Sequence, residues 1–392
     1  MGAGIFVVIG VAAGLAGPAL LISLVVAGAI STFTALSFAE LASAIPKEGG
    51  VYEFAHELLP PPVGFISGWL WLLSNAVAGV VVALGFASYL VVFLPPLPKN
   101  AVATLVCLFV TAVNYFGVRR SSLLNNALVV AKIGILLIFV LLGLTLIRSE
   151  NFTPFAPNGL EGILRGTALI FFAYGGFARI TTLGEEVRDP RRTIPLAMLL
   201  SLGISAAVYL LVGFTSIGLV GYRSLAASGS PLAEASAVEG PFAVSLTSTG
   251  ALMATLSVLL TTLLGLSRVA FAMSRNRDLP RALSKIHSKR KTPHASILAL
   301  GLLMAVLAYL YDFTEAVALS NFALILYYAI GNYSALKLKT RLYPLFVPVA
   351  GLSSCLILLP FLTFYSWISG LAAVLVGLIY YYAKAYLSRP SS

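Results

Sequence analysis

The stretch FFAYGGF, residues 171–177, places two adjacent glycines inside an apolar segment of membrane-spanning length. A related break, GAGIF at residues 2–6, stands at the start of the chain. Glycine weakens the helical hydrogen-bond ladder, and hydrocarbon tolerates unpaired backbone groups only where they are buried in protein or line a wet cavity. Paired interruptions of this kind in two halves of a chain are typical of binding sites in secondary transporters.

The composition around these breaks is that of an integral membrane protein. The 392 residues are 59% hydrophobic and 10% charged, and the mean hydropathy of +0.98 is far above that of a soluble domain. A helix of about 20 apolar residues crosses the bilayer core. We therefore expect an all-α membrane protein with twelve apolar segments, the first too short to span. They lie near residues 1–15, 18–45, 63–94, 101–118, 126–147, 160–184, 194–220, 242–275, 294–311, 315–337, 344–362 and 366–387.

The net charge of +11 is unevenly distributed among the connections. Most of the 25 Lys and Arg residues fall in residues 46–62, 119–125, 187–193, 275–293, 337–343 and 384–392. The positive-inside rule places these segments in the cytoplasm, so we expect a multi-pass protein of the cell membrane with cytoplasmic basic loops and C-terminus. The basic run at 275–291 lacks the interleaved aromatic residues of a nucleic-acid surface. We expect lipid bilayer contact and no nucleic acid.

The sequence predicts neither a metal site nor a cofactor. Cys107 and Cys355 fall inside predicted spans, so we expect two buried free thiols. The three histidines are scattered at helix ends and cannot form a metal cluster with either cysteine.

Two longer motifs follow the breaks. AELASAIPKEGGVY occupies residues 39–52, and EEVRDPRRTIP occupies residues 185–195. Together with the breaks, in this order and at this spacing, they resemble the amino acid–polyamine–organocation (APC) permeases, especially the cationic-amino-acid and archaeal proton-coupled branches. The specific motifs cover residues 2–280, and beyond them the resemblance rests on the number of helices.

The resemblance implies the LeuT-type fold, in which two inverted five-helix repeats form a single transmembrane domain, residues 1–392. We place the repeats at residues 1–148 and 160–337, followed by peripheral helices at 344–387. Helices 1, 2, 6 and 7 would rock as a bundle against the remaining scaffold. Because Met1 stands directly against the first break, we expect the true start of the protein to lie upstream, and the alternative is an atypically short first segment.

The breaks supply both charges that an amino acid needs to bind, since a helix N-terminus attracts its carboxylate and free carbonyls attract its ammonium. The N–H groups expected to receive the carboxylate are those of Gly2, Ala3 and Gly4. The carbonyls that the resemblance assigns to the ammonium are those of Phe172, Ala173 and Gly175. Tyr174 either covers the substrate or belongs to the core. The alternative for the glycines is close packing between membrane helices.

Lys132 is an ionisable residue deep within an apolar segment. A charge there costs about 2.5–3.5 kcal/mol, so its side chain should face a partner or a cavity. The resemblance implies that Lys132 occupies the place of the sodium ion of other relatives and contacts helix 1 carbonyls and the Ser257 hydroxyl. Proton binding by Lys132 would then drive transport. Snorkelling toward the cytoplasmic interface is the alternative.

Arg179 follows the second break by about one helical turn. Relatives commonly carry an acidic residue just after the position of Phe177, where this chain has Ala178 and Arg179. We expect a gate or structural ion pair between Arg179 and Glu186 or Glu40, with contact to a substrate carboxylate as the alternative. No carboxylate falls at the midplane of a predicted span, which favours neutral substrates over cations and polyamines.

These features predict a secondary active transporter of amino acids, by proton-coupled symport. The alternative is a proton-independent exchanger, in which Lys132→Ala would retain exchange. An ion channel requires an open pore with a filter or charged rings, and an intramembrane enzyme requires a motif such as His-Glu-x-x-His, which the sequence lacks. We therefore expect no enzyme. The expected partners are an amino acid, protons and the bilayer, and the oligomeric state stays open.

Overall fold

The computed structural model describes residues 4–47, 49–117, 121–187, 189–288 and 292–387, except for the side chains of 121–125, 182–186 and 190. No strand occurs in this part of the chain. The α-helices are α1 (Gly4–Ala16), α2 (Leu20–Ala44), α3 (Val51–Leu58), α4 (Pro61–Phe93), α5 (Lys99–Phe116), α6 (Ser121–Gly143), α7 (Gly159–Tyr174), α8 (Pro190–Ala227), α9 (Pro231–Ser236), α10 (Pro241–Arg275), α11 (His294–Leu310), α12 (Phe313–Leu336), α13 (Phe346–Leu358) and α14 (Phe364–Leu387). The 3₁₀ segments are η1 (Gly17–Ala19), η2 (Leu144–Leu146), η3 (Ser149–Phe152), η4 (Gly175–Glu186), η5 (Ala237–Glu239), η6 (Arg281–Ser284) and η7 (Leu359–Phe361).

The helices have the lengths that a bilayer requires. Within the described residues, nine helical stretches are long and apolar enough to cross a membrane, and one of them, Gly4–Ala44, joins α1 and α2. Two shorter apolar stretches are His294–Leu310 and Phe346–Phe361. Each of the twelve segments expected from hydropathy corresponds to a helix, so the all-α membrane class is confirmed. The division into two inverted repeats stays a prediction.

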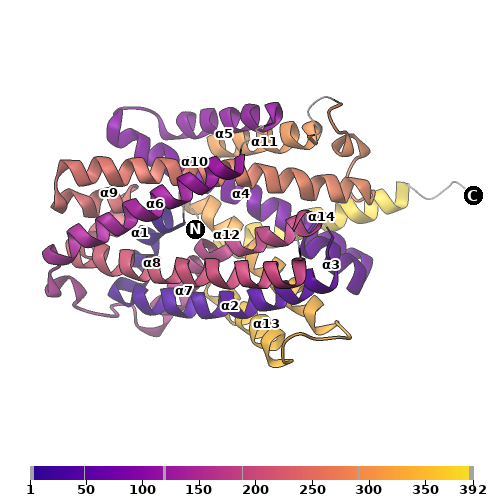
Figure 1. Ribbon diagram of the computed structural model, residues 1–392, viewed down its shortest axis with the longest axis horizontal. Helices are drawn as coiled ribbons and strands as arrows, with labels where there is room; N and C mark the ends of the chain where they lie inside the picture. Colours follow the sequence, from indigo (N-terminus) through magenta and orange to yellow (C-terminus); the bar gives the residue numbers. More distant parts are fainter. Residues whose placement is uncertain (1–3, 48, 118–120, 188, 289–291, 388–392) are drawn as a thin grey trace, which may run out of the picture.

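The long helices pack as two groups. The first, which we call the inner bundle, consists of α1, α2, α7 and α8, whose members pack on one another. The second, the scaffold, contains α4, α5, α10, α11 and α12, with α6 between α8 and α10. In Figure 1, α2, α7 and α8 run along one side of the molecule, and α5 and α11 run along the opposite side. The site described below lies where the two groups face each other.

Glycines allow the inner bundle to pack closely. A Cβ on Gly213 of α8 would lie 2.9 Å from the Leu24 side chain of α2, and one on Gly28 of α2 would lie 3.4 Å from the Tyr174 hydroxyl. Small residues at such contacts let helix backbones approach within a membrane, where no hydrophobic effect drives association.

The short helix α3, which the sequence did not predict, is tied to the end of α10. The Tyr52 hydroxyl donates to Asp278 Oδ2 at 2.8 Å, and Asn276 Nδ2 donates to Glu53 Oε1 at 2.8 Å. These bonds hold the connections on either side of α3 and after α10 at one end of the molecule, as expected for two loops on the same side of a membrane.

Candidate functional site

The two glycine-rich breaks meet inside the bundle. A Cβ placed on Gly4, the first residue of α1, would lie 2.6 Å from the Cβ of Ala173 and 2.7 Å from its Cα. No real side chain fits at that distance, so the contact requires glycine at position 4. Gly4 and Ala173, both expected at the site, are thus in direct contact, whereas Gly2 and Ala3 lie outside the described residues.

A tyrosine from the scaffold holds the first break. The Tyr89 hydroxyl of α4 donates to the Phe6 carbonyl at 2.6 Å and accepts the Leu232 N–H of α9 at 3.2 Å. Tyr89 and Phe6 are both buried, and their rings pack edge to face with centroids 6.4 Å apart. The start of α1 is therefore fixed to α4 and α9 at once.

The second break is a change of helix type. The α-helix α7 ends at Tyr174, and the chain continues as η4, a 3₁₀ stretch of 12 residues. Runs of 3₁₀ helix beyond three or four residues are uncommon and often mark a functional hinge. The two glycines at 175 and 176 stand where this change begins.

The expected ammonium-binding carbonyls already accept hydrogen bonds. The Phe172 carbonyl accepts the Gly175 N–H. The Ala173 carbonyl accepts the Tyr209 hydroxyl of α8 at 3.3 Å, and the Gly175 carbonyl accepts the Tyr328 hydroxyl of α12 at 2.9 Å. The 3₁₀ ladder of η4 also directs the Ala178 N–H onto the Gly175 carbonyl, so an ammonium at these carbonyls would share or displace a donor that is already bound.

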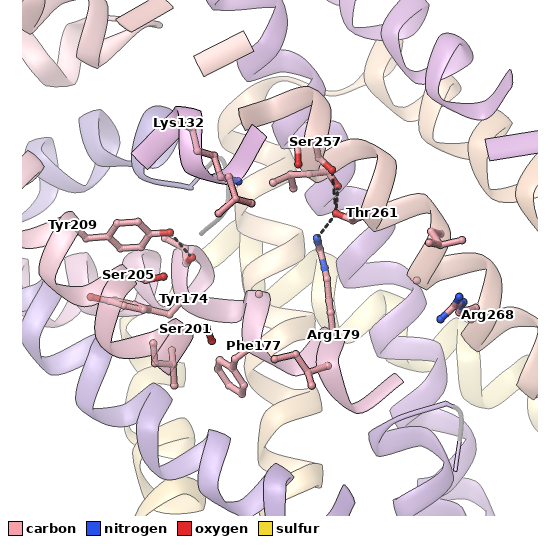
Figure 2. Close-up of a pocket in the computed structure, with 18 residues that line it drawn as sticks. Lys132, Tyr174, Phe177, Arg179, Ser201, Ser205, Tyr209, Ser257, Thr261 and Arg268 are labelled. Carbon is pink, nitrogen blue, oxygen red and sulfur yellow. Dashed lines mark hydrogen bonds between the residues drawn. The ribbon is translucent and has the colours of Figure 1, made fainter. Parts of the chain in front are cut away.

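A cavity of about 340 Å³ opens beside the second break. One wall is α8, the opposite wall is α10, and α6 and the break complete the lining (Figure 2). Its polar and charged lining residues are Lys132, Tyr174, Arg179, Ser201, Ser205, Tyr209, Ser257, Thr261 and Arg268. This volume is at the lower end of the range for ligand pockets, about 300–1,000 Å³, and suits a small ligand.

A smaller cavity of about 60 Å³ adjoins it and reaches the first break. It is lined by Gly4, by Ser74 and Asn75 of α4, and by Gly175. Ala173, Gly176, Arg179 and Val258 line both cavities. The larger and the smaller cavity therefore adjoin each other where the two breaks meet.

Lys132 lies in the wall of the larger cavity. Its side chain extends from α6 and is 3% exposed, and Ser257 lines the same cavity from α10 (Figure 2). Lys132 therefore points into the protein interior and not toward the cytoplasmic interface. The structure brings together the two residues expected to couple protons, while the coupling itself stays a prediction.

Arg179 reaches across the cavity to α10. Its Nη1 lies 3.4 Å from Thr261 Oγ1 (Figure 2). Glu40, one of its expected partners, is 1% exposed and lies elsewhere, where its Oε1 accepts the backbone N–H groups of Leu342 at 2.5 Å and Tyr343 at 3.4 Å. The structure therefore does not bring Arg179 and Glu40 together, because Glu40 joins α2 to the connection before α13. The Glu186 side chain lies outside the described residues.

Tyr174 is packed in the core and also lines the larger cavity, while its covering of the substrate stays a prediction. It is 3% exposed, its hydroxyl donates to the Leu24 carbonyl at 3.2 Å, and its ring centroid lies 5.2 Å from that of Tyr209. The same side chain lines the larger cavity. It is a packed residue whose exposed edge faces the site.

A row of polar residues on one face of α8 was not identified from the sequence. Arg268 on α10 was not identified either. Ser201, Ser205 and Tyr209 follow one another at intervals of four, so they share one helix face. Arg268 continues the face of α10 that carries Thr261. These residues could have been found in the sequence as polar residues that recur at helical spacing within an apolar segment.

The chain matches the family model described as amino acid permease over residues 1–386. It is 36% identical to an uncharacterized transporter of Mycobacterium tuberculosis over 404 aligned positions, which cover 99% of this chain and 89% of the relative. It is 31% identical to a methylthioribose transporter of Bacillus subtilis and 30% identical to a branched-chain amino acid permease of the same species. Both alignments cover 97% of this chain and 89% of the relative.

Proposed function

The chain belongs to the amino acid permease family, and from this membership we propose that it is a proton-coupled symporter of neutral amino acids that works by alternating access. Its family and relatives are transporters, so the protein is a transporter and not an enzyme. The observation that carries the proposal is the meeting of Gly4 and Ala173 beside two adjoining cavities.

The substrate lies at this junction, with its two charged groups on the two breaks. The N-terminal end of α1 attracts the carboxylate through the helix dipole and its free N–H groups. The carbonyls of Ala173 and Gly175 attract the ammonium, which would share them with the Tyr209 and Tyr328 hydroxyls or displace those hydroxyls. The side chain of the substrate extends into the larger cavity, where the polar faces of α8 and α10 limit its size and polarity.

The charge of the cavity favours neutral over cationic substrates. Lys132, Arg179 and Arg268 line it, and none of its described lining residues is Asp or Glu. At an effective dielectric constant of about 20, two like charges 4 Å apart repel by about 4 kcal/mol. A lysine or arginine side chain would meet this repulsion, although the sequence motifs resemble those of the cationic-amino-acid branch.

Lys132 and Ser257 bind the coupling proton. Lys132 lies in the cavity wall, where its amine can release and rebind a proton during the cycle. Protonated Lys132 would attract the carbonyls at the start of α1 and the Ser257 hydroxyl. Protonation would thus fasten α6 to the inner bundle and to α10.

The two helix groups provide the moving parts. The inner bundle α1, α2, α7 and α8 packs internally, and it meets the scaffold through α2 on α12, through the broken helices α1 and α7, and around the cavity. Rocking of one group against the other would open the junction alternately to the two sides of the membrane. The two inverted repeats, residues 1–148 and 160–337, belong to the same proposal.

The test is uptake by the purified protein in proteoliposomes. Labelled leucine, alanine, lysine and glutamate would be offered separately, with and without an inward proton gradient. We expect leucine or alanine to accumulate only with the gradient, and lysine to be taken up least. Gradient-independent counterflow would contradict symport and support the exchanger, and the absence of uptake of all four would contradict amino acid transport.

A further inference from the structure

Glu239 is a carboxylic acid that makes no hydrogen bond to any of the residues that the structure describes. It ends η5, the short segment between α9 and α10, and its side chain is partly buried. Both of its carboxyl oxygens are inaccessible to solvent, and neither has a hydrogen-bond partner in the part of the chain that the structure describes. Burial of such a group in the ionised form is costly unless it is paired.

The carboxyl group packs against the last turn of α6. A Cβ placed on Gly143 would lie 2.7 Å from Glu239 Oε1, 2.5 Å from the Thr215 methyl group and 3.1 Å from Leu219 Cδ1. Gly143 ends α6, and Thr215 and Leu219 belong to α8. The carboxyl group therefore occupies a contact where η5, α6 and α8 converge, and at Gly143 the contact has room for glycine only. Its surroundings are apolar apart from the Thr215 hydroxyl, which is also buried and has no hydrogen-bond partner among the described residues.

No charge near this contact compensates an ionised Glu239. The elements packed against η5 are α6, α9 and α10, and α8 joins them at Gly143. The charged residues nearest to the contact along these elements are Lys132 on α6, Arg148 after α6, Arg223 on α8, Glu234 on α9 and Arg268 on α10. Arg148, Arg223 and Glu234 are exposed, and Lys132 and Arg268 line the inner cavity. None of the five forms an ion pair or hydrogen bond with Glu239 among the described residues.

Two physical effects favour the protonated form. Burial raises the pKa of Glu239 from 4.5 to about 7. The C-terminal end of α6 also carries partial negative charge, which repels a carboxylate. A group in this position exchanges its proton near neutral pH.

We propose that Glu239 is a proton-binding site that holds the ends of α6 and α8 together when protonated and releases them when ionised. An ionised carboxylate must leave the apolar contact to be hydrated, and it takes η5 and the start of α10 with it. Because α6 also carries Lys132, the same change alters the wall of the central cavity. This last step rests on the proposed transport function, whereas the proton binding does not.

The direction of the pH effect follows from linkage. The folded protein binds the Glu239 proton more tightly than the unfolded chain does, since the pKa is raised. The stabilisation of the folded protein by protonated Glu239 is therefore complete below about pH 4.5, and it is lost as the pH rises through about 7. Glu239→Gln keeps the neutral form at every pH and removes this dependence.

The first test is thermal unfolding of the full-length protein in one detergent at about pH 5.5 and about pH 8. We expect the Tm of the wild type to fall by about 2 °C more than that of Glu239→Gln across this range. Glu234→Gln, an exposed glutamate of the adjacent α9, should behave as the wild type. Gly143→Ala should weaken the pH dependence by displacing the carboxyl group. Equal pH dependence in Glu239→Gln and the wild type would overturn the proposal.

The second test is leucine counterflow at equal pH on both sides, which removes the proton gradient as a driving force. We expect the wild-type rate to fall about threefold from pH 6 to pH 8, in line with a population shift of the protonated form. The rate of Glu239→Gln should keep only the pH dependence that Lys132 contributes, so it should fall less than the wild-type rate over the same range. Absence of counterflow in every variant would contradict the transport function, while the unfolding comparison would still decide the role of Glu239.

Discussion

Tyrosine hydroxyls bond backbone carbonyls at both breaks, but the two breaks differ in how closely their backbones are packed. At the first, the Phe6 carbonyl is bonded to Tyr89, which is itself bonded to α9, and Gly4 touches Ala173 with no space between them. At the second, the chain stays 3₁₀ for 12 residues, and a Cβ on Gly176 would meet nothing within 4 Å.

This difference assigns different roles to two similar sequence features. At the first break the backbone is closely packed, and glycine permits the close approach of Gly4 to Ala173. The second borders both cavities and keeps open space next to its backbone. We infer that the first break fixes the position of the substrate, and that the second adapts to its side chain. Substitutions at the two breaks should therefore impair transport in different ways.

The largest effect is expected from Gly4→Val. The added side chain would overlap the Ala173 backbone and force α1 away from the second break, since overpacking displaces backbone. Leucine uptake should fall to less than about a tenth of the wild-type rate.

Two glycine controls separate this effect from general damage. Gly176→Ala should retain transport capacity and alter mainly the apparent KM, because its Cβ enters open space in the cavity. Gly203→Ala, at a lipid-facing site of α8 with no neighbour within 4 Å, should leave uptake unchanged. Equal loss in Gly4→Val and Gly176→Ala would remove the distinction between the breaks.

The next largest effect is expected from Lys132→Ala. If protonated Lys132 fastens α6 to the first break, its removal uncouples the proton gradient, and concentrative uptake should fall at least about tenfold. Counterflow without a gradient would persist at a reduced rate. Lys99→Ala, at the exposed first residue of α5, is the matched control. Unchanged accumulation in Lys132→Ala would show that proton coupling does not depend on this residue.

The smallest effects are expected from the tyrosine hydroxyls. Removing one hydrogen bond costs about 1 kcal/mol, or about fivefold in an equilibrium constant. Tyr89→Phe should appear as a lower Tm with an unchanged KM, because its hydroxyl holds the packed break. Tyr328→Phe should change the KM for leucine about fivefold with little change in Tm, because its hydroxyl lies on a substrate-binding carbonyl. Interchanged effects would reverse the roles assigned to the two breaks.

Much of the fold could be predicted from the sequence because the relevant signals are local. Hydropathy over about 20 residues identified the membrane helices, and the glycines marked the breaks. The 3₁₀ conformation of η4 could not be foreseen, because the hydroxyl that bonds its first carbonyl comes from Tyr328 of the distant α12. Helix α3 was missed because it is short and lies between two spans.

The site could be predicted in part, for the same reason. Lys132 stood out because a charge in an apolar segment is rare. The tyrosines Tyr89, Tyr209 and Tyr328 resemble core residues in the sequence, and only the fold directs their hydroxyls onto the breaks. The long-range contacts of Glu40 and Glu239 were equally invisible, since one binds the Leu342 backbone and the other packs on Gly143.

The central claim is that an amino acid binds where Gly4 meets Ala173. The most direct measurement is an experimental structure of the protein with the amino acid that gives the highest uptake. The account predicts its carboxylate at the start of α1 and its ammonium within hydrogen-bonding distance of the Ala173 and Gly175 carbonyls. A ligand bound away from both breaks would contradict it.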